Sequence, residues 1–519
     1  MFTDELRAEV WEDICQRDVR ALAGKITPAV LAEAAKRTGV VLVKSPLCLG
    51  NLVWLGIACA LHMSLDFACI LTMTVKLLED QQAFYSSELG KARRNGQRQE
   101  RGKAGKTGKG KHGKSKHCPQ RDDPTRLSEE AFVKARRRMP LAFWVNLIII
   151  LGEQFQEQHR SLLTFHGYRL LAVDGTCIDM ANWKRLRDYF GTAKNARGRQ
   201  SVQARMVMLQ FPFTRLPHRY ELCPLDEGEV TIARRLAQHL AKNDLVLLDA
   251  CFWSYGLLCD IQMRGAFFAL PIKGKRLNLK AVRNFGRQDK EVCWTPKDSR
   301  GQWRKEGLQG SINLRVITYQ IPGFRAQKLA TNLLDRANIS RDDWVRLAGD
   351  CTAEGRFQPG LCHRRWEIET TYRELKVEQG MNGNLRGRTP ECIQYEVAGH
   401  VVLYLLVRWL MVEAAVKHAI DPLRLSFKNA LRELFAMHSS LVIAQGRWVY
   451  VLLEKLLDRV AEHQVPYRPG RSYPRRKQSS NHKRKSKHPR RSRTTKAPQS
   501  RNRKPKAAKR QRAKSSKKG

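Results

Sequence analysis

The feature that most constrains the fold is a series of short apolar runs after residue 168. The runs YRLLAVDGT, DLVLLDACF and GAFFALPIK begin at residues 168, 244 and 265. Each has the length and the Leu, Val and Phe content typical of a buried strand. Between the first two runs, SVQARMVMLQFPFTRLPHRYELCPL predicts strands joined near Pro212–Pro217, and EVTIARRLAQHLAKN predicts an amphipathic helix. This order of elements predicts an α/β fold, in which helices flank a sheet.

Changes in composition and periodicity divide the chain into segments. The expected division is an N-terminal helical region over 1–90, a disordered basic linker over 91–124, a helical lead-in segment over 125–165, the first part of the α/β core over 166–273, a β-rich insertion over 274–350, the rest of the core with C-terminal helices over 351–463, and a disordered basic tail over 464–519.

The chain carries a large excess of positive charge. The formal net charge is +46. Residues 464–519 contain 23 Lys and Arg and no Asp or Glu, and residues 91–117 contain 11 Lys and Arg with one Glu. Because these two segments supply only 33 of the 46 charges, the folded part is basic as well. A polyanion such as nucleic acid is therefore the expected partner.

Cysteine spacing and the apolar segments bear on the compartment. The 13 cysteines contain no CxxC pair, which indicates reduced thiols in a cytosolic protein. The N-terminus, MFTDELRAEVWEDICQRD, is acidic and is not expected to be a signal peptide. Residues 49–75 approach the length of a membrane span, but His62 and Asp66 interrupt them, so two short buried helices are expected. Membrane association through this segment stays open as an alternative.

Two of the predicted strands are followed by aspartate, at Asp174 and Asp249. An acid at the carboxyl end of a buried strand in an α/β sheet faces the crevice in which ligands bind. Each residue has a structural alternative. Asp174-Gly175 is a common turn pair, and Asp249 suits a cap or a turn.

A third acid lies in LCHRRWEIETTYRELKVEQG, residues 361–380, which we expect to be helical. Helical spacing places Glu369 on the same face as Cys362, Arg365 and Lys376. The structural alternative is a solvated face with an Arg365–Glu369 ion pair at i,i+4.

Three carboxylates that converge in one crevice repel one another unless cations are bound. Mg²⁺ and Mn²⁺ prefer such oxygen ligands, and a pair of ions stabilises both the attacking and the leaving oxygen of a phosphodiester. The neighbouring cations would hold DNA phosphates. Those of this segment are Arg364, Arg365, Arg373 and Lys376.

These motifs resemble those of bacterial insertion-sequence transposases of the DDE superfamily, which have a ribonuclease-H-like catalytic core. The resemblance rests on AVDGT, LLDACFWSYG and RRWEIETTYRELK, and it covers about residues 125–450. It is closest to the subgroup with a Tyr-x2-Arg-x3-Glu-x6-Lys motif, which matches here at Arg365, Glu369 and Lys376. The tyrosine position holds Cys362, and a thiol is a poor substitute for a phenol. In the family this tyrosine contacts a phosphate near the transposon end. Either that contact is altered in this chain, or Tyr372 or His363 replaces the missing tyrosine.

The resemblance implies a mixed sheet flanked by helices and a set of site residues. Asp174, Asp249 and Glu369 are the implied catalytic acids, which bind Mg²⁺ or Mn²⁺, with two ions expected. Arg365 and Lys376 are the implied phosphate contacts, and Trp344, with Trp303 as the second choice, is the candidate for stacking on a flipped base.

The expected function is that of an insertion-sequence transposase that cleaves the ends of its element and transfers the 3′-hydroxyl into target DNA. The implied partners are double-stranded DNA, as terminal inverted repeats and as target, and a second copy of the chain when DNA is bound. No membrane is expected, and the implied location is the cytoplasm at the nucleoid. Two alternatives stay open: a nuclease of the same fold without strand transfer, and a non-catalytic basic DNA-binding derivative.

Overall fold

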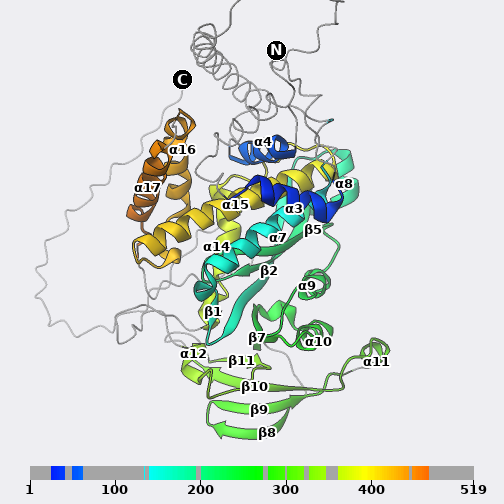
Figure 1. The fold of residues 1–519 in the computed structure, drawn as a ribbon. Coiled ribbons are helices and arrows are strands. Elements are labelled where there is room, and N and C mark those ends of the chain that lie inside the picture. Colours follow the sequence, from blue (N-terminus) through cyan, green and yellow to red (C-terminus); the bar gives the residue numbers. More distant parts are fainter. Residues whose placement is uncertain are drawn as a thin grey trace, which may run out of the picture. The chain divides into compact units, whose positions relative to one another are not determined.

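The structure, a computed structural model, describes residues 25–40, 49–61, 134, 139–194, 200–272, 279–297, 301–320, 326–345, 361–443 and 447–466. Figure 1 shows the described helices and strands. The prediction of a disordered linker over 91–124 lies outside the described residues, as does that of a disordered tail over 464–519 except for residues 464–466. At Gln464 the tail was predicted to begin too early, because this residue forms an antiparallel bridge with Leu425.

One sheet of 11 strands runs through the described part of the chain. The strands are β1 (Thr164–Phe165), β2 (Tyr168–Met180), β3 (Thr192–Lys194), β4 (Gln200–Phe211), β5 (Leu216–Cys223), β6 (Asp244–Leu248), β7 (Phe267–Ile272), β8 (Leu279–Gly286), β9 (Asp289–Trp294), β10 (Ile312–Tyr319) and β11 (Gln327–Thr331).

The core of the sheet is mixed, with β2 at its centre. On one side β2 pairs antiparallel with β4, which pairs antiparallel with β5. On the other side β2 pairs parallel with β6, which pairs parallel with β7. The apolar runs identified in the sequence form β2, β6 and β7. The prediction of an α/β fold with a mixed, ribonuclease-H-like sheet is therefore confirmed.

Strands β8 to β11 extend this same sheet rather than forming a second one. β11 pairs antiparallel with β7, and β10, β9 and β8 follow in that order. Figure 1 shows these strands as a continuation of the core beyond β7. The segment expected to be β-rich thus contains four strands, while the domain boundaries drawn from the sequence stay predictions.

Helices cover both faces of the core sheet. The described α-helices are α3 (Pro28–Thr38), α4 (Leu49–Leu61), α7 (Leu141–Gln158), α8 (Lys184–Phe190), α9 (Glu229–Ala237), α10 (Tyr255–Met263), α11 (Gln302–Lys305), α12 (Arg341–Val345), α13 (Leu361–Arg364), α14 (Glu367–Arg373), α15 (Pro390–Lys417), α16 (Phe427–Ile443) and α17 (Arg447–Glu462). Shorter turns are η1 (Arg160–Leu162), η2 (Ala250–Phe252), η3 (Glu374–Glu378) and η4 (Pro422–Arg424).

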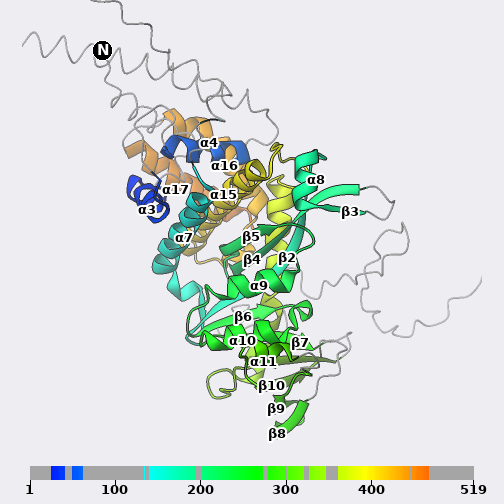
Figure 2. The ribbon, with the colours of Figure 1, turned by 90° about the vertical axis from the view of Figure 1, so that its right-hand side faces the viewer.

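Strand alternation sends successive side chains of β2 into two different cores. Leu171 and Val173 belong to the larger core, with residues of α9 and α10. Leu170 and Ala172 belong to a smaller core, with residues of α12 and α13. Figure 2 shows α9 and α10 against the sheet. Asp174 comes two residues after Ala172 and therefore points to the same face as the smaller core.

β2 is longer than the sequence predicted. We expected the strand to end at Asp174-Gly175, but it continues to Met180 because β4 supplies a partner at each step, pairing Asp174 with Met208 and Gly175 with Val207. The turn alternative for Asp174 is therefore wrong. A Cβ at position 175 would lie 2.6 Å from Cδ of Glu229, so the Glu229 side chain packs against this glycine and would have to shift.

The apolar helix α15 lies in the protein interior. It is the one helix in the described part of the chain that is long and apolar enough to cross a membrane, and 94% of its most apolar window is buried. It contacts α4, α7 and α17, as a core helix does. Of the segment 49–75, the structure describes α4, which packs on α15, and residues 62–75 lie outside the described residues.

Candidate active site

The first two predicted acids come directly after the point at which the pairing between the neighbouring strands β2 and β6 ends. In the parallel pair β2–β6 the last register partners are Val173 and Leu248. Asp174 and Asp249 are the next residues after these two. Adjacent strands lie about 4.8 Å apart, and partners in register point to the same face. β6 stops at Leu248 because the 3₁₀ turn η2 begins there, with Asp249 in extended conformation at its start. The two carboxyl groups are therefore neighbours.

The third acid, Glu369, lies in α14. The prediction of one continuous helix over 361–380 is wrong. α13 ends at Arg364, α14 begins at Glu367, and the π-helical turn η3 follows from Glu374. A π-helical turn shifts the register of side chains and is frequent at functional sites. The π-helical turn accordingly interrupts the single face expected for Arg365, Glu369 and Lys376 between Glu369 and Lys376, whereas Arg365 and Glu369 remain paired.

Side chains of α14 and η3 form hydrogen bonds with β2. The Tyr372 hydroxyl donates to the backbone carbonyl of Asp174 at 2.6 Å. Lys376 Nζ donates to the carbonyl of Cys177 at 2.6 Å and lies 3.2 Å from Oγ1 of Thr176. β6 has ended by this point, so the carbonyls of β2 are open on that side to these donors. The segment that carries Glu369 is thereby held beside Asp174.

Arg365 lies between two of the three acids. Its Nη1 is 3.6 Å from Oδ1 of Asp249 and 4.0 Å from Oε1 of Glu369. The arginine side chain is 13% exposed, whereas that of Glu369 is 41% exposed. The i,i+4 ion pair expected from the sequence is thus present, and the same guanidinium also reaches Asp249.

The pKa of Asp174 shows that its carboxylate interacts electrostatically with the other two acids. The pKa of Asp174 is raised to about 6, chiefly by burial. The Gly175 amide, which donates to its carboxylate at 2.9 Å, and the charge of Arg365 lower this pKa. The charges of Glu369 and Asp249 raise it. The three carboxylates therefore repel one another, and Arg365 offsets part of that repulsion.

A buried ion-pair network lies behind α14. Arg215, in the β4–β5 turn at φ +58°, pairs with Glu367 at 2.7 Å and with Glu374 at 2.9 Å. Glu374 also pairs with Arg408 of α15 and accepts from the Tyr404 hydroxyl at 2.8 Å. Burial raises the pKa of Glu374, but Arg408 and Arg215 outweigh it and leave that pKa below its ordinary value.

Sequence reasoning missed this network, because Arg215 lies 152 positions from Glu367 and no local pattern joins them. It links the ends of α14 to the sheet and to α15.

The predicted DNA-binding cations lie in different surroundings. Arg373 is exposed. Arg364 is only 6% exposed and lies over the Phe213 ring at 5.1 Å, and burial lowers its pKa. Lys376 is half-buried and bound to β2. As the chain lies here, Arg364 and Lys376 support the site from within, so their expected contacts with DNA need these side chains to move.

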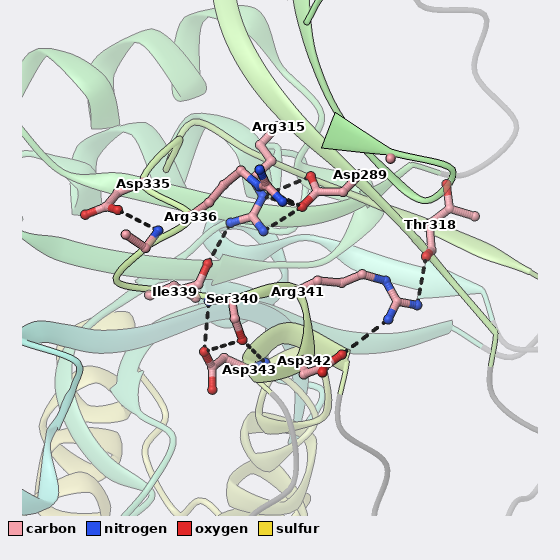
Figure 3. Close-up of polar contacts among 12 residues, drawn as sticks. Asp289, Arg315, Thr318, Asp335, Arg336, Ile339, Ser340, Arg341, Asp342 and Asp343 are labelled. Atoms are coloured by element: carbon pink, nitrogen blue, oxygen red, sulfur yellow. Dashed lines mark hydrogen bonds and ion pairs between the residues drawn. The ribbon is translucent and has the colours of Figure 1, made fainter. Parts of the chain in front are cut away.

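Trp344, the expected base-stacking residue, is fully buried in the smaller core. Figure 3 shows why this segment is held down. Arg315 of β10 pairs with Asp289 at 2.8 Å and donates to the Ile339 carbonyl at 2.7 Å, and Asp343 accepts from the Ser340 hydroxyl at 2.7 Å. In this arrangement the indole is out of reach of a DNA base.

Other tryptophans are more accessible. Trp303, the second choice, is half-buried and packs on Tyr255 with ring centroids 5.8 Å apart. Trp366, which sequence reasoning did not single out, is 50% exposed beside the Arg365 guanidinium, 5.8 Å from its ring. In the sequence, its position between the charged residues Arg365 and Glu367 was the one local indication that Trp366 is exposed.

The three acids provide oxygen donors of the type that a divalent ion binds. In this arrangement, however, their carboxylates are not placed to coordinate one ion together. Among the side chains that the structure describes, no group of three or more His, Cys, Asp or Glu is arranged to hold a metal ion. The guanidinium of Arg365 lies against two of the three carboxylates instead. The chemistry of the donors fits such an ion, provided that Arg365 moves away.

Comparison with known proteins identifies this part of the chain. Residues 165–406 match the family model described as the transposase DDE domain. This range contains Asp174, Asp249 and Glu369. These residues of the chain are thus similar to a transposase DDE domain, and the expected resemblance to bacterial insertion-sequence DDE transposases is confirmed. Enzymes of this family generally use a divalent metal ion.

Individual relatives agree with this family. The transposase InsG for insertion sequence element IS4, from Escherichia coli (strain K12), is 27% identical over 257 residues, which cover 48% of this chain and 54% of InsG. A second protein of that strain, InsZ, is 24% identical over 30% of this chain and 50% of its own length. The chain therefore spans about half the length of the curated relatives it matches.

Among solved structures, a piggyBac transposase synaptic complex with hairpin DNA covers 66% of both chains at 10% identity, with a TM-score of 0.33. This likeness is too weak to bear on the fold.

Proposed function

We propose that this protein is the DNA transposase of an insertion sequence, which cleaves phosphodiesters at the element's ends and joins the freed 3′-hydroxyl to target DNA. The observation that carries the proposal is the convergence of Asp174, Asp249 and Glu369 on the guanidinium of Arg365, inside a transposase DDE domain. The segments that supply these groups lie up to 195 positions apart in the sequence.

Asp174, Asp249 and Glu369 are the residues proposed to hold Mg²⁺ or Mn²⁺, with two ions. Such ions, when bound, lower the pKa of the attacking water or 3′-hydroxyl and stabilise the leaving oxygen. Burial together with neighbouring negative charge makes Asp174 a poor place for a lone carboxylate and a good place for one that binds a cation.

Arg365 is proposed to exchange partners during the reaction. Without DNA its guanidinium neutralises Asp249 and Glu369. A DNA phosphate offers the same guanidinium a bidentate partner, and its departure leaves the two carboxylates free for metal. The expected roles of Arg364, Arg373, Lys376 and Trp344 in DNA binding stay predictions, and those of the buried members require α12 and α13 to shift.

The proposed partners are the terminal inverted repeats, the target DNA and a second copy of this chain on the bound DNA. The high positive charge supports a polyanionic partner, and the predicted tail and linker would add salt-sensitive affinity. The proposed location is the cytoplasm, at nucleoid DNA.

The test uses purified full-length protein and a DNA fragment that carries the coding sequence with its genomic flanks, in Mg²⁺. Cleaved ends and end-labelled strands joined to plasmid are both expected. Asp249→Asn should reduce both products by about 100-fold or more. Asp226→Asn, which changes an exposed aspartate outside the site, should not.

Cleavage without joined product would indicate the nuclease alternative. Unchanged activity in Asp249→Asn would overturn the assignment of this acid and favour a non-catalytic DNA-binding protein.

A further inference from the structure

A second exposed tryptophan lies beyond the far end of β2. Trp183 precedes α8 and is 43% exposed. The guanidinium of Arg388, from the loop before α15, lies 4.7 Å from the centroid of its ring. An exposed aromatic ring paired with an arginine is an arrangement on which a nucleic-acid base stacks.

Four exposed cations lie near this tryptophan, three on the helix α8 that follows it and Arg388 over its ring. Lys184, Arg185, Arg187 and Arg388 are all exposed. We call these four residues with Trp183 the α8 surface. Two acids accompany them: Asp188 on α8, and Glu391, whose pKa is lowered chiefly by hydrogen bonds to its own backbone amide and to Thr389 and, to a smaller extent, by the charge of Arg185. The surface therefore keeps a net positive charge, which suits phosphates.

The α8 surface is connected to the candidate active site by a continuous segment. Lys376 holds η3 against Thr176 and Cys177, and farther along β2 the Asn382 side chain bonds Asp179. From Asp174 to Met180, where β2 ends, six residues span about 20 Å. That distance equals about six base pairs of a DNA duplex.

We infer that the α8 surface binds the DNA that leads away from the cleaved phosphodiester, with Trp183 stacked on a base and the four cations on the backbone. This inference rests on the proposed function for its DNA substrate. It adds a contact region beyond the far end of β2, and that end is itself about six base pairs from Asp174. The region is built from segments outside the acidic motifs. Its stacking residue is accessible, whereas Trp344 is buried.

The experiment measures DNA binding rather than turnover. Full-length protein in EDTA, which prevents cleavage, is titrated into a fluorescein-labelled duplex interrupted by a short single-stranded gap that contains bromodeoxyuridine. Stacking on an aromatic ring tolerates any base sequence, so the terminal repeats need not be known. Trp183→Ala is expected to lose about 5- to 150-fold in affinity, and Trp183→Phe less.

The matched control is Tyr450→Ala, an aromatic residue of α17 that is 73% exposed and belongs to no part of this surface. It should bind as the unmodified protein does. Irradiation should cross-link the bromodeoxyuridine to the peptide containing Trp183. Arg388→Ala should reduce the slope of log affinity against log salt by about one.

Equal affinities of Trp183→Ala and Tyr450→Ala, with no cross-link near residue 183, would overturn the inference. So would a change in sedimentation of Trp183→Ala without DNA, because the surface would then join two copies of the chain. A failure of the proposed function is seen separately, as cleavage that survives in Asp249→Asn. Circular dichroism of each variant shows that it is folded.

Discussion

The hydroxyl of Tyr372 donates a hydrogen bond of 2.6 Å to the backbone carbonyl of Asp174. The donor lies in the helix of one candidate catalytic acid, Glu369, and the acceptor belongs to another. The bond therefore fixes the spacing between α14 and β2, and with it the spacing between two carboxylates that are 195 positions apart.

Removing that hydroxyl tests whether this spacing matters. Tyr372→Phe should lose about 1 kcal/mol of unfolding free energy, the usual net value of one hydrogen bond. Joined product should fall by about tenfold because α14 is then free to shift, and misplacement of about 1 Å costs up to 100-fold. Tyr189→Phe, which changes an exposed tyrosine of α8, is the control. Normal product formation by Tyr372→Phe would show that the bond does not position Glu369.

The buried network behind α14 should be important for stability. Arg215→Met leaves the carboxylates of Glu367 and Glu374 without one of their cations, so we expect a loss of about 3–5 kcal/mol in urea unfolding. Arg459→Met breaks a more exposed pair with Glu433 and should cost less than about 1 kcal/mol. Comparable losses in both variants would contradict the importance assigned to Arg215.

The raised pKa of Asp174 predicts a particular pH dependence. Because its pKa of about 6 in the folded protein exceeds the ordinary value of 3.8, its contribution to stability is fully present below pH 4 and is lost as the pH rises through 6. Asp174→Asn removes this loss. In EDTA, the stability of unmodified protein relative to the variant should fall by about 2 kcal/mol between pH 4 and pH 7. A constant difference would indicate that Asp174 is not perturbed.

Arg365 should affect metal and DNA in opposite directions. Arg365→Gln removes the cation beside Asp249 and Glu369, so Mn²⁺ should bind more tightly, by about tenfold, in a titration followed by electron paramagnetic resonance without DNA. Affinity for duplex DNA should decrease, because a phosphate partner is lost. Arg373→Gln, which changes an exposed cation of α14, should leave Mn²⁺ affinity unchanged. Weaker Mn²⁺ binding by Arg365→Gln would contradict the proposed exchange of partners.

The sequence by itself determined the elements whose patterns are local. The apolar runs at 168, 244 and 265 became β2, β6 and β7, because a buried strand is recognisable from a few adjacent side chains. The sequence also identified Asp249 at the end of a strand, and the ordered motifs indicated the DDE family before any coordinates. Asp174 was singled out as a candidate as well, but its strand was ended too early, since only pairing with β4 carries β2 past Gly175.

Tertiary structure alone decided what depends on partners far apart in the chain. The pairing of β11 with β7 merged the β-rich segment into the core sheet. No local sequence pattern marks the ion pairs of Arg215 with Glu367 and Glu374, yet these pairs hold the helix that carries Glu369. Burial separated residues that composition treats alike, placing Trp344 and Arg364 inside the protein and Trp183 and Arg373 at its surface. Side-chain type and spacing are properties of the sequence, whereas solvent exposure and long-range ion pairs exist only once distant segments have packed together.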